Sequence, residues 1–508
     1  MLDLEKLVFN FIGVSKKEKV GFIGNYVTFE ILSNYFNIID LSERKNINSN
    51  ENESIKNLII ESDIYEQDNM YYEISNEEIR NNLNNFNVYS ISTGPSNDIE
   101  VSNSDIYIDS EISDVTIKDN KLYLPILINE KIYNPSNSDN KFELLIFYLN
   151  ESDNIEYLNR FINDGIVQKA NPDKITRQFI KSLLDILNNT NILLLEDKHI
   201  DTFLAKYIEL IAVSQNVHVI VDSKNKGLYK YAEIKRDEDH LINLIRYFIL
   251  NSDEVNKNKV KNFRQLMLSN SVLFLNKTKP KISVTLVSMR EERLKRIFMD
   301  LSKQKSVSLQ VVLLTHGYTL SEEKNQELLS LGNFDLKVIS GDKSLNLGEC
   351  LNMCIDYIEN DYVVKMDDDD FYYSNFIIDL YIGLSYSQAQ IVGKYGFYFY
   401  LNALNLVGKR RADKEFKNVS EVKGNGIFCK TSLLKNYGFS KLSYGEDSDL
   451  FERVRNDKGK IYSIHSFDMC VFRDGDKNNH SYKVNDINFL RDAKTIYFGE
   501  PNNTISTE

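Results

Sequence analysis

The stretch Tyr362-Val-Val-Lys-Met-Asp-Asp-Asp-Asp370 is the most informative part of this sequence, because an apolar run leads directly into four consecutive aspartates. The β-branched residues of the run predict a buried strand. Four adjacent carboxylates at a strand end repel one another, and a hard cation such as Mg²⁺ or Mn²⁺ supplies the missing counter-charge. Side chains alternate along a strand, so Asp367 and Asp369 point to the same side and can face one metal. A solvated acidic turn is the alternative, but the preceding hydrophobic strand favours the metal.

The residues before this stretch predict the sheet to which it belongs. From residue 281 onward, apolar strands alternate with amphipathic helices. We predict strands at Ile282–Val287, Leu309–Leu314, Leu336–Ile339 and Tyr362–Met366, and helices at Glu291–Lys303 and Gly348–Ile358. This order is that of a nucleotide-binding α/β sheet, whose ligands bind off the carboxyl ends of the strands.

Three later segments carry further candidates. In Val422-Lys-Gly-Asn-Gly-Ile-Phe428 the glycines let the backbone approach a ligand closely, although an ordinary turn has the same composition. In Gly445-Glu-Asp-Ser-Asp449 we predict Asp447 as a general base, with Glu446 in reserve, and Asp449 as a helix cap. His480 lies in a polar segment and can complete a metal shell, or it is a lone exposed histidine.

Together, and in this order, these segments resemble glycosyltransferase family 2, whose fold is of the GT-A type. The resemblance covers about residues 281–482, and the ordered set is more specific than any one motif. It implies a nucleotide-contacting loop at Val287–Glu291 and a helix that carries Asn352. The implied donor-binding residues are Ser288, Arg290, Glu291, Asn352, Asp367, Asp368, Gly424, Asn425 and Gly426. The implied metal ligands are Asp367, Asp369, Asp370 and His480, and the implied catalytic residues are Asp447 and Glu446.

The second strand departs from the family pattern. It usually ends in acidic residues that help to hold the nucleoside, but here it ends in Thr315 and His316. The catalytic prediction is unaffected, whereas the base of the donor nucleotide stays open.

The resemblance implies inverting, metal-dependent transfer of a hexosyl or N-acetylhexosaminyl group from a nucleoside-diphosphate sugar, with a UDP-sugar favoured. The acceptor would be a hydroxyl of a glycan, of a teichoic-acid-like polyol-phosphate polymer of the cell wall, or of a protein. One alternative is a sugar nucleotidyltransferase, which would need a glycine-rich phosphate loop that Val287–Arg293 lacks. The other is a noncatalytic glycan-binding or scaffold protein that keeps the fold.

The N-terminal half also predicts α/β structure. We expect strands at Lys19–Gly24, Asn57–Glu61, Asn87–Ile91, Asp105–Ile108, Phe142–Tyr148, Ile192–Leu195 and Val217–Val221, with helices at Arg177–Asn188 and Thr202–Ala212. At 508 residues the chain is too long for one core. We therefore predict a Rossmann-like subdomain over 1–150, a second Rossmann-like subdomain with a helical linker over 151–279, and the GT-A catalytic domain over 280–508.

This half is more weakly similar to the two-lobed GT-B glycosyltransferases of the spore-maturation type. The segments that carry the similarity are Leu58–Ser62, Leu122–Ile126, Tyr133–Pro135 and Tyr207–Ala212. Glu209 stands where such enzymes hold the donor ribose, but Ser214-Gln-Asn216 replaces the glycine expected shortly after it. The resemblance therefore implies a degenerate donor site, and a scaffold or acceptor-binding role for this half.

Composition limits the partners and the location. A formal net charge of −13 argues against nucleic acid as the main partner. The sequence has no signal-peptide pattern and no apolar run that would span a bilayer. We expect a cytoplasmic protein, with the inner membrane face as a second possibility and a homo-oligomer left open. The four cysteines are too few for a disulfide framework, so we expect buried thiols.

Overall fold

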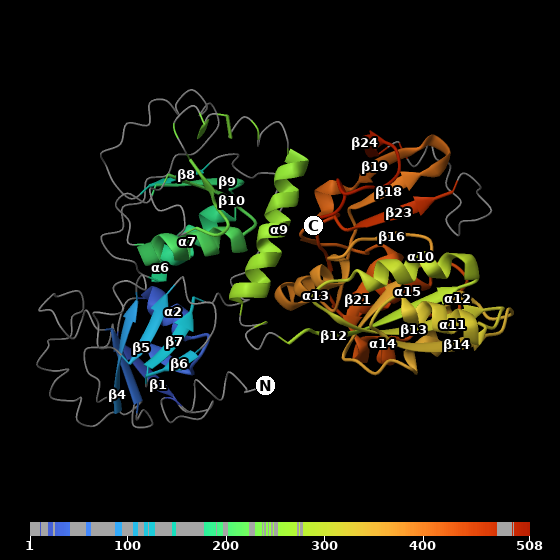
Figure 1. Cartoon of the computed structure of the whole chain (residues 1–508), viewed down its shortest axis with the longest axis horizontal. Helices are drawn as coiled ribbons and strands as arrows, with labels where there is room; N and C mark the ends of the chain where they lie inside the picture. Colours follow the sequence, from blue (N-terminus) through green and yellow to red (C-terminus); the bar gives the residue numbers. More distant parts are fainter. Residues whose placement is uncertain are drawn as a thin grey trace, which may run out of the picture. The chain divides into compact units, whose positions relative to one another are not determined.

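The computed structural model describes most of the second half of the chain and separate parts of the first. The described residues are 11, 19–23, 26–40, 57–61, 87–93, 105–109, 116–119, 121–126, 145–148, 177–188, 190–196, 202–222, 229–235, 237, 240–241, 243–244, 247, 252–271, 274, 278–474, 490 and 492–508. The chain forms two compact units (Figure 1). We call them the N-terminal unit, which holds almost all of the chain up to Lys277, and the C-terminal unit, Thr278–Glu508.

The N-terminal unit begins with a seven-stranded sheet in the order β2-β1-β3-β4-β5-β7-β6. Neighbouring strands are parallel except for β6 and β7. Its elements are β1 (Val20–Ile23), α2 (Tyr26–Leu32), β2 (Ile38–Asp40), β3 (Asn57–Glu61), β4 (Asn87–Thr93), β5 (Ile106–Asp109), β6 (Thr116–Lys118) and β7 (Lys121–Pro125). The sheet is mostly parallel, as the alternating apolar segments predict.

A second, fully parallel sheet follows in the order β11-β10-β9-β8. Its elements are β8 (Leu145–Tyr148), α6 (Arg177–Leu187), β9 (Ile192–Glu196), α7 (Thr202–Ser214), β10 (His218–Asp222) and β11 (Glu233–Ile234), and α9 (Ser252–Asn270) comes last. Since β8 pairs with β9, the second sheet begins before residue 150. The division of this unit into two domains stays a prediction.

The C-terminal unit is built on an eight-stranded sheet in the order β14-β13-β12-β15-β21-β17-β22-β20. One half, β14 to β15, is parallel, and β21 joins it antiparallel to β15. The elements up to the aspartates are β12 (Lys281–Ser288), α10 (Glu291–Ser302), β13 (Ser308–His316), α11 (Glu322–Ser330), β14 (Asp335–Gly341), α12 (Leu347–Ile355) and β15 (Tyr362–Met366). The remaining strands and helices of this sheet are α13 (Phe376–Ser387), β17 (Ile391–Gly393), β20 (Lys417–Asn418), β21 (Ile427–Lys430), α14 (Thr431–Tyr437), α15 (Glu446–Asn456) and β22 (Ile461–Ser463).

A smaller sheet, in the order β16-β23-β18-β19-β24, completes this unit. It consists of β16 (Phe371–Tyr372), β18 (Phe397–Leu401), β19 (Leu406–Arg410), β23 (Met469–Arg473) and β24 (Ala493–Phe498). Its first strand, β16, directly follows the four aspartates and pairs with β23. The two sheets therefore meet where the aspartates lie.

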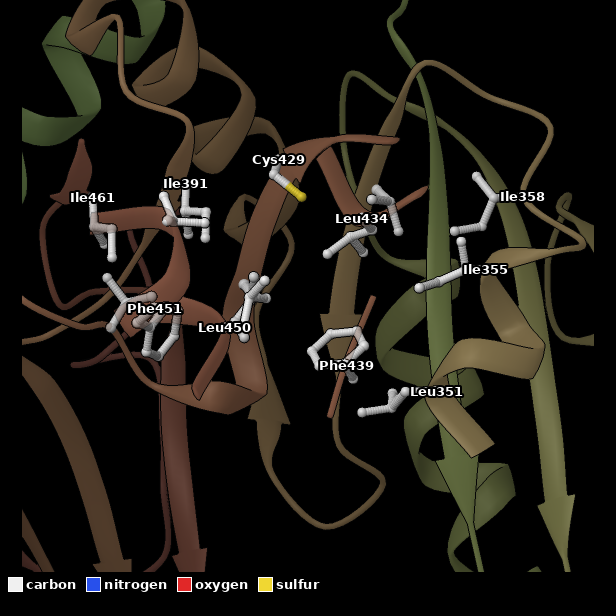
Figure 2. Packing of buried hydrophobic residues seen from close by; sticks show 14 residues of the cluster. Leu351, Ile355, Ile358, Ile391, Cys429, Leu434, Phe439, Leu450, Phe451 and Ile461 are labelled. Atoms are coloured by element: carbon white, nitrogen blue, oxygen red, sulfur yellow. The ribbon is translucent and has the colours of Figure 1, made fainter. Parts of the chain in front are cut away.

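The main core of the C-terminal unit lies between the large sheet and the helices α12, α14 and α15. Figure 2 shows Leu351 and Ile355 of α12, Leu434 of α14, and Leu450 and Phe451 of α15. Strands β15, β17, β21 and β22 contribute the opposing apolar side chains. Because this packing fixes α15 against β21, it also fixes Glu446 and Asp447 in the first turn of α15.

The predicted buried thiols are present: all four cysteines are free and buried. Within the described part of the chain, we find no helix with the length and apolar character that crossing a membrane requires.

Candidate active site

The four aspartates lie at the carboxyl end of β15, in the middle of the large sheet. In sheet order, β12 lies on one side of β15 and β21 on the other. Lys365 pairs in register with Ile427, so the end of β15 and the start of β21 share one edge. Residues after β12, after β15 and before β21 are thereby brought to one place, as expected for a ligand site on an α/β sheet.

Three of the four aspartates form a cluster that could hold a metal ion. One carboxylate oxygen from each of Asp367, Asp369 and Asp370 lies within 4.8 Å of the others. Among the residues that the structure describes, this is the group of metal-ligating side chains that meets this geometry. Oxygen-only ligands of this kind suit Mg²⁺ or Mn²⁺.

Asp370 is the most buried of the three and is held from two sides. The side-chain amide of Asn425 and the backbone N–H of Phe472, at 2.8 Å, both donate to its carboxylate. Burial, and then the neighbouring carboxylates of Asp369 and Asp367, raise the pKa of Asp370 to about 8. Among the described residues no cation forms an ion pair with Asp370 itself, and the buried Oδ1 of Asn425 has no hydrogen-bond partner in that part of the chain. Both observations fit a cation that binds there.

Asp368 is not a member of this cluster and anchors the loop after β12. Its carboxylate accepts a hydrogen bond from Ser288 Oγ at 2.5 Å and forms a close ion pair with Arg290. Arg290 also lies 3.2 Å from Asp369 Oδ2. Burial raises the pKa of Asp368, while Arg290 opposes that effect. The loop Ser288–Arg290 is therefore tied to the aspartates.

Lys365 connects the metal-type cluster to Asp447. Its ammonium is buried, lies 3.1 Å from Asp367 Oδ1 and 3.5 Å from Asp447 Oδ2, and donates to Gly424 O at 2.9 Å. Burial alone would lower the pKa of Lys365, but Asp367, Asp447 and Glu446 raise it well above its ordinary value. Lys365 is therefore a permanent cation between two groups of carboxylates.

Asp447 and Glu446 begin α15 after Gly445, whose φ of +79° favours glycine. One oxygen of Asp447 lies against Lys365, and its Oδ1 is buried with no hydrogen-bond partner among the described residues. Burial raises the pKa of Asp447, and Lys365 counteracts it. For Glu446, burial and then Asp447 raise the pKa to about 7. The prediction that Asp449 caps the helix is wrong: Gly445 is the N-cap, and Asp449 pairs with Arg453 at 2.7 Å.

The glycine segment closes the site from the side of β21. A Cβ on Gly424 would lie 1.8 Å from Asp447 Oδ2, so only glycine lets this backbone contact the carboxylate. A Cβ on Gly426 would lie 3.2 Å from the ring of Phe376, which is tight. Tyr372 joins this segment to the aspartates, because its hydroxyl donates to Asn425 O at 2.9 Å and accepts from the Asp367 N–H at 3.0 Å.

Several predicted residues are not brought to the carboxylates. The side chain of Asn352 exchanges two hydrogen bonds with the backbone of Phe439, at 2.7 and 2.8 Å. Glu291 is exposed at the start of α10. Thr315 donates to Tyr318 O at 2.8 Å, and His480 lies outside the described residues. Donor-binding roles for Asn352 and Glu291 and metal binding by His480 stay predictions.

Lys365, Tyr372 and Lys423 are members of the site that the sequence did not single out. A lysine within an otherwise apolar strand is itself a signal, because a buried cation requires a partner. Tyr372 and Lys423 carry no such signal, since tyrosine and lysine are common next to turns.

Comparison with solved structures gives several distant likenesses. No family model matches the chain, and no curated protein matches it. One similar structure is that of S. aureus TarS, 17% identical over 38% of this chain and 37% of that chain, with a TM-score of 0.31. A second is the mannosyltransferase PcManGT from Pyrobaculum calidifontis in complex with GDP-Man and Mn²⁺, 12% identical over 40% of this chain and 59% of that chain, with a TM-score of 0.33. TarS 1–349 in complex with UDP-GlcNAc is 16% identical over 40% of this chain and 61% of that chain, with a TM-score of 0.32. This chain spans less than two thirds of each protein, and at these TM-scores we base its function on its own site.

Proposed function

We propose that this chain is a divalent-metal-dependent glycosyltransferase of the GT-A type, related to family 2. It would transfer a sugar from a nucleoside diphosphate to an acceptor hydroxyl with inversion. One observation carries the proposal. A triad of metal-type carboxylates, Asp367, Asp369 and Asp370, lies at the end of β15, and a separate carboxylate, Asp447, lies across Lys365 from it.

The triad would hold Mn²⁺ or Mg²⁺ on the donor diphosphate. When bound, the ion supplies positive charge that stabilises the leaving nucleoside diphosphate. Arg290 orients Asp368 and Asp369, and Tyr372 fixes the backbone at Asp367. These contacts preorganise the ligands before the donor arrives, which lowers the cost of binding.

Asp447 would remove the proton from the acceptor hydroxyl. The ammonium of Lys365 pairs with Oδ2 of Asp447 and favours the ionised form of that carboxylate. Oδ1 of Asp447, which has no hydrogen-bond partner among the described residues, can accept the proton. Because the attacking hydroxyl and the leaving nucleoside diphosphate lie on opposite sides of the anomeric carbon in a single displacement, the configuration inverts. Glu446 is the second candidate for the base.

The donor would contact Ser288, Arg290 and the segment Gly424–Gly426. UDP-GlcNAc and GDP-Man are bound in two of the similar structures, and we favour a UDP-sugar that carries a hexosyl or N-acetylhexosaminyl group. The acceptor would be a glycan, a polyol-phosphate polymer or a protein. A cytoplasmic location and a homo-oligomer stay predictions.

The N-terminal unit would not be a second transferase. Glu209, predicted to stand at a degenerate donor site, is fully buried and fully engaged. It accepts from Lys206 Nζ at 2.6 Å and from the backbone N–H groups of Tyr231 and Ala232 at 2.6 and 2.9 Å. These contacts give the carboxylate a structural role, so we propose a scaffold or acceptor-binding function for this unit.

The test is release of free nucleoside diphosphate from a panel of nucleotide sugars by the full chain with Mn²⁺. We expect one UDP-sugar to be hydrolysed or transferred, with activity lost in EDTA. Asp369→Asn and Asp367→Asn should each abolish release while the protein stays folded, since removing one of several crowded carboxylates relieves repulsion. No release from any donor would favour a noncatalytic glycan-binding protein, and normal turnover by either variant would remove the metal assignment.

A further inference from the structure

Lys423 is a cation of the site that the proposed mechanism does not use. Its ammonium lies 4.9 Å from the centroid of the Phe397 ring, and its backbone N–H donates to Lys394 O at 2.8 Å. Among the described residues, no carboxylate forms an ion pair with it, whereas Lys365 and Arg290 are both paired. Burial lowers the pKa of Lys423, and the more distant carboxylates of Asp370 and Asp367 oppose this effect.

A second cation, Arg411, lies near enough to Lys423 to lower its pKa further. Its guanidinium stacks 4.3 Å from the centroid of the Tyr395 ring. Its carboxylate neighbour is Glu421, at 3.7 Å, and both side chains are more than a third exposed, so this pair contributes little. Like charges in one region repel each other, and a bound anion would offset that repulsion.

The backbone at Arg411 is in the left-handed region, with φ of +54° and ψ of +37°. This conformation is uncommon for residues other than glycine and asparagine and costs free energy that the surrounding structure must offset. Such strain clusters at ligand sites. Here the left-handed backbone of Arg411 positions its guanidinium over the ring of Tyr395. Two residues further along the chain, the ring of Phe397 contacts the ammonium of Lys423.

The sheet order places Lys423 on the far side of the aspartates from the loop Ser288–Arg290. Along the shared edge, Ser288 and Arg290 follow β12, the aspartates follow β15, and Lys423 precedes β21. Lys423 is therefore separated from the donor loop by the aspartates. Its neighbour in sequence, Gly424, contacts the proposed base Asp447.

We propose that Lys423 and Arg411 bind an oxyanion, a phosphate or carboxylate, on the acceptor whose hydroxyl Asp447 deprotonates. The inference rests on the proposed function and adds a substrate class to it: the acceptor carries negative charge near the reacting hydroxyl. Lysine supplies a point charge, and arginine supplies a planar fork that matches phosphate or carboxylate oxygens. Phe397 and Tyr395 hold the two side chains in place through their rings.

Binding of glycerol 3-phosphate and of glycerol to the full chain tests this, measured by calorimetry with Mg²⁺ and UDP present and with Mg²⁺ alone. We expect the wild-type protein to prefer glycerol 3-phosphate. Lys423→Gln should weaken that binding about tenfold or more, the usual effect of losing a hydrogen bond to a charged group. Arg411→Asn, which tolerates the left-handed backbone, should weaken it as well. Lys414→Gln is the matched control, because Lys414 is an exposed cation just after Arg411, 3.0 Å from Asp413.

Two results would contradict the proposal, and the first would assign the cations to the donor diphosphate in place of the acceptor. If Lys423→Gln weakens binding of Mg²⁺ with UDP as strongly as it weakens binding of glycerol 3-phosphate, the cations serve the donor diphosphate and the proposal is wrong. Equal affinity of the wild-type protein for glycerol and glycerol 3-phosphate would also overturn it. These measurements need no turnover. A failure of the proposed function, seen as no nucleotide release from the donor panel, is therefore distinguishable from a failure of this inference.

Discussion

One carboxylate oxygen of Asp447, Oδ1, is buried and has no hydrogen-bond partner among the described residues. We expect Asp447→Asn to lower turnover by about 10²–10⁴-fold, the usual effect of removing a general base. Affinity for the donor with metal should barely change, because the base acts on the acceptor. Turnover and donor dissociation constants of the two proteins provide the measurement. A large loss of donor affinity at nearly normal turnover would assign Asp447 to the nucleotide and make Glu446 the base.

Lys365 is the buried cation on which both carboxylate groups depend. We expect Lys365→Met to destabilise the metal-free protein by about 3–5 kcal/mol, because breaking a buried pair leaves charge uncompensated. The double variant Lys365→Met, Asp447→Asn should recover part of that loss, since it removes one of the stranded carboxylates, but it should stay inactive. Urea unfolding of both variants and of the wild type measures this. Equal stability of the single and double variants would show that Lys365 does not stabilise Asp447.

At the scale of elements, the pattern of apolar residues predicted the strands well wherever consecutive residues of the strand are buried. The bounds of β3 and β15 agree with the expected ranges, and those of β12, β13, α10 and α12 differ by one to three residues at an end. The sequence missed α11, because Leu328 is its single buried residue and its polar side chains hide the helical period. It also gave no signal for the short strands β16, β17, β20 and β22, because their pairing is decided by partners far along the chain.

The candidate site divides in the same way. Asp367, Asp369, Asp370 and Asp447 follow from motifs that lie next to predicted elements. The roles of Asp368 and Asn352 depend on contacts with Ser288 and Phe439, which are 80 and 87 residues away. No local pattern contains that information, so sequence reasoning could not anticipate these two contacts.

Glu209 ties α7 to the segment before β11. We expect Glu209→Ala to lower the free energy of unfolding of the N-terminal unit by about 2–4 kcal/mol, because it removes a buried ion pair with Lys206 and the acceptor of two backbone N–H groups. Glycosyl transfer by protein that remains folded should stay within about twofold. Urea unfolding and turnover at a temperature where the variant is folded provide the measurements. Unchanged stability together with a large loss of turnover would restore a ligand-binding role for Glu209.

For the whole molecule, the burial of His218 makes the free energy of unfolding depend on pH. Burial, and then Lys259, lower the pKa of His218 to about 3, while in the unfolded chain it is about 6.5. Above pH 6.5 the ring is neutral in both states. Between pH 6.5 and 3 the unfolded chain binds a proton that the folded chain excludes, so the free energy of unfolding falls by about 1.4 kcal/mol per pH unit.

We therefore expect His218→Gln to reduce the loss of stability between pH 7 and pH 5 by about 2 kcal/mol. Urea unfolding of the N-terminal unit at both pH values measures it. The control is His240→Gln, since His240 is only half-buried in the same unit. An unchanged pH dependence in His218→Gln would show that His218 does not set it.

Several contacts that assemble the site join residues far apart in sequence, such as the bonds from Asn425 and Phe472 to Asp370, which span 55 and 102 positions. Such long loops close late, because their entropy is lost before many contacts are gained. A metal site built this way should be absent from the folding transition state. Mn²⁺ at about 100 times its dissociation constant should then slow unfolding of the C-terminal unit about 100-fold and leave its refolding rate unchanged. Stopped-flow refolding and unfolding with and without Mn²⁺ would measure this, and faster refolding with the ion would mean that the aspartates meet their partners early.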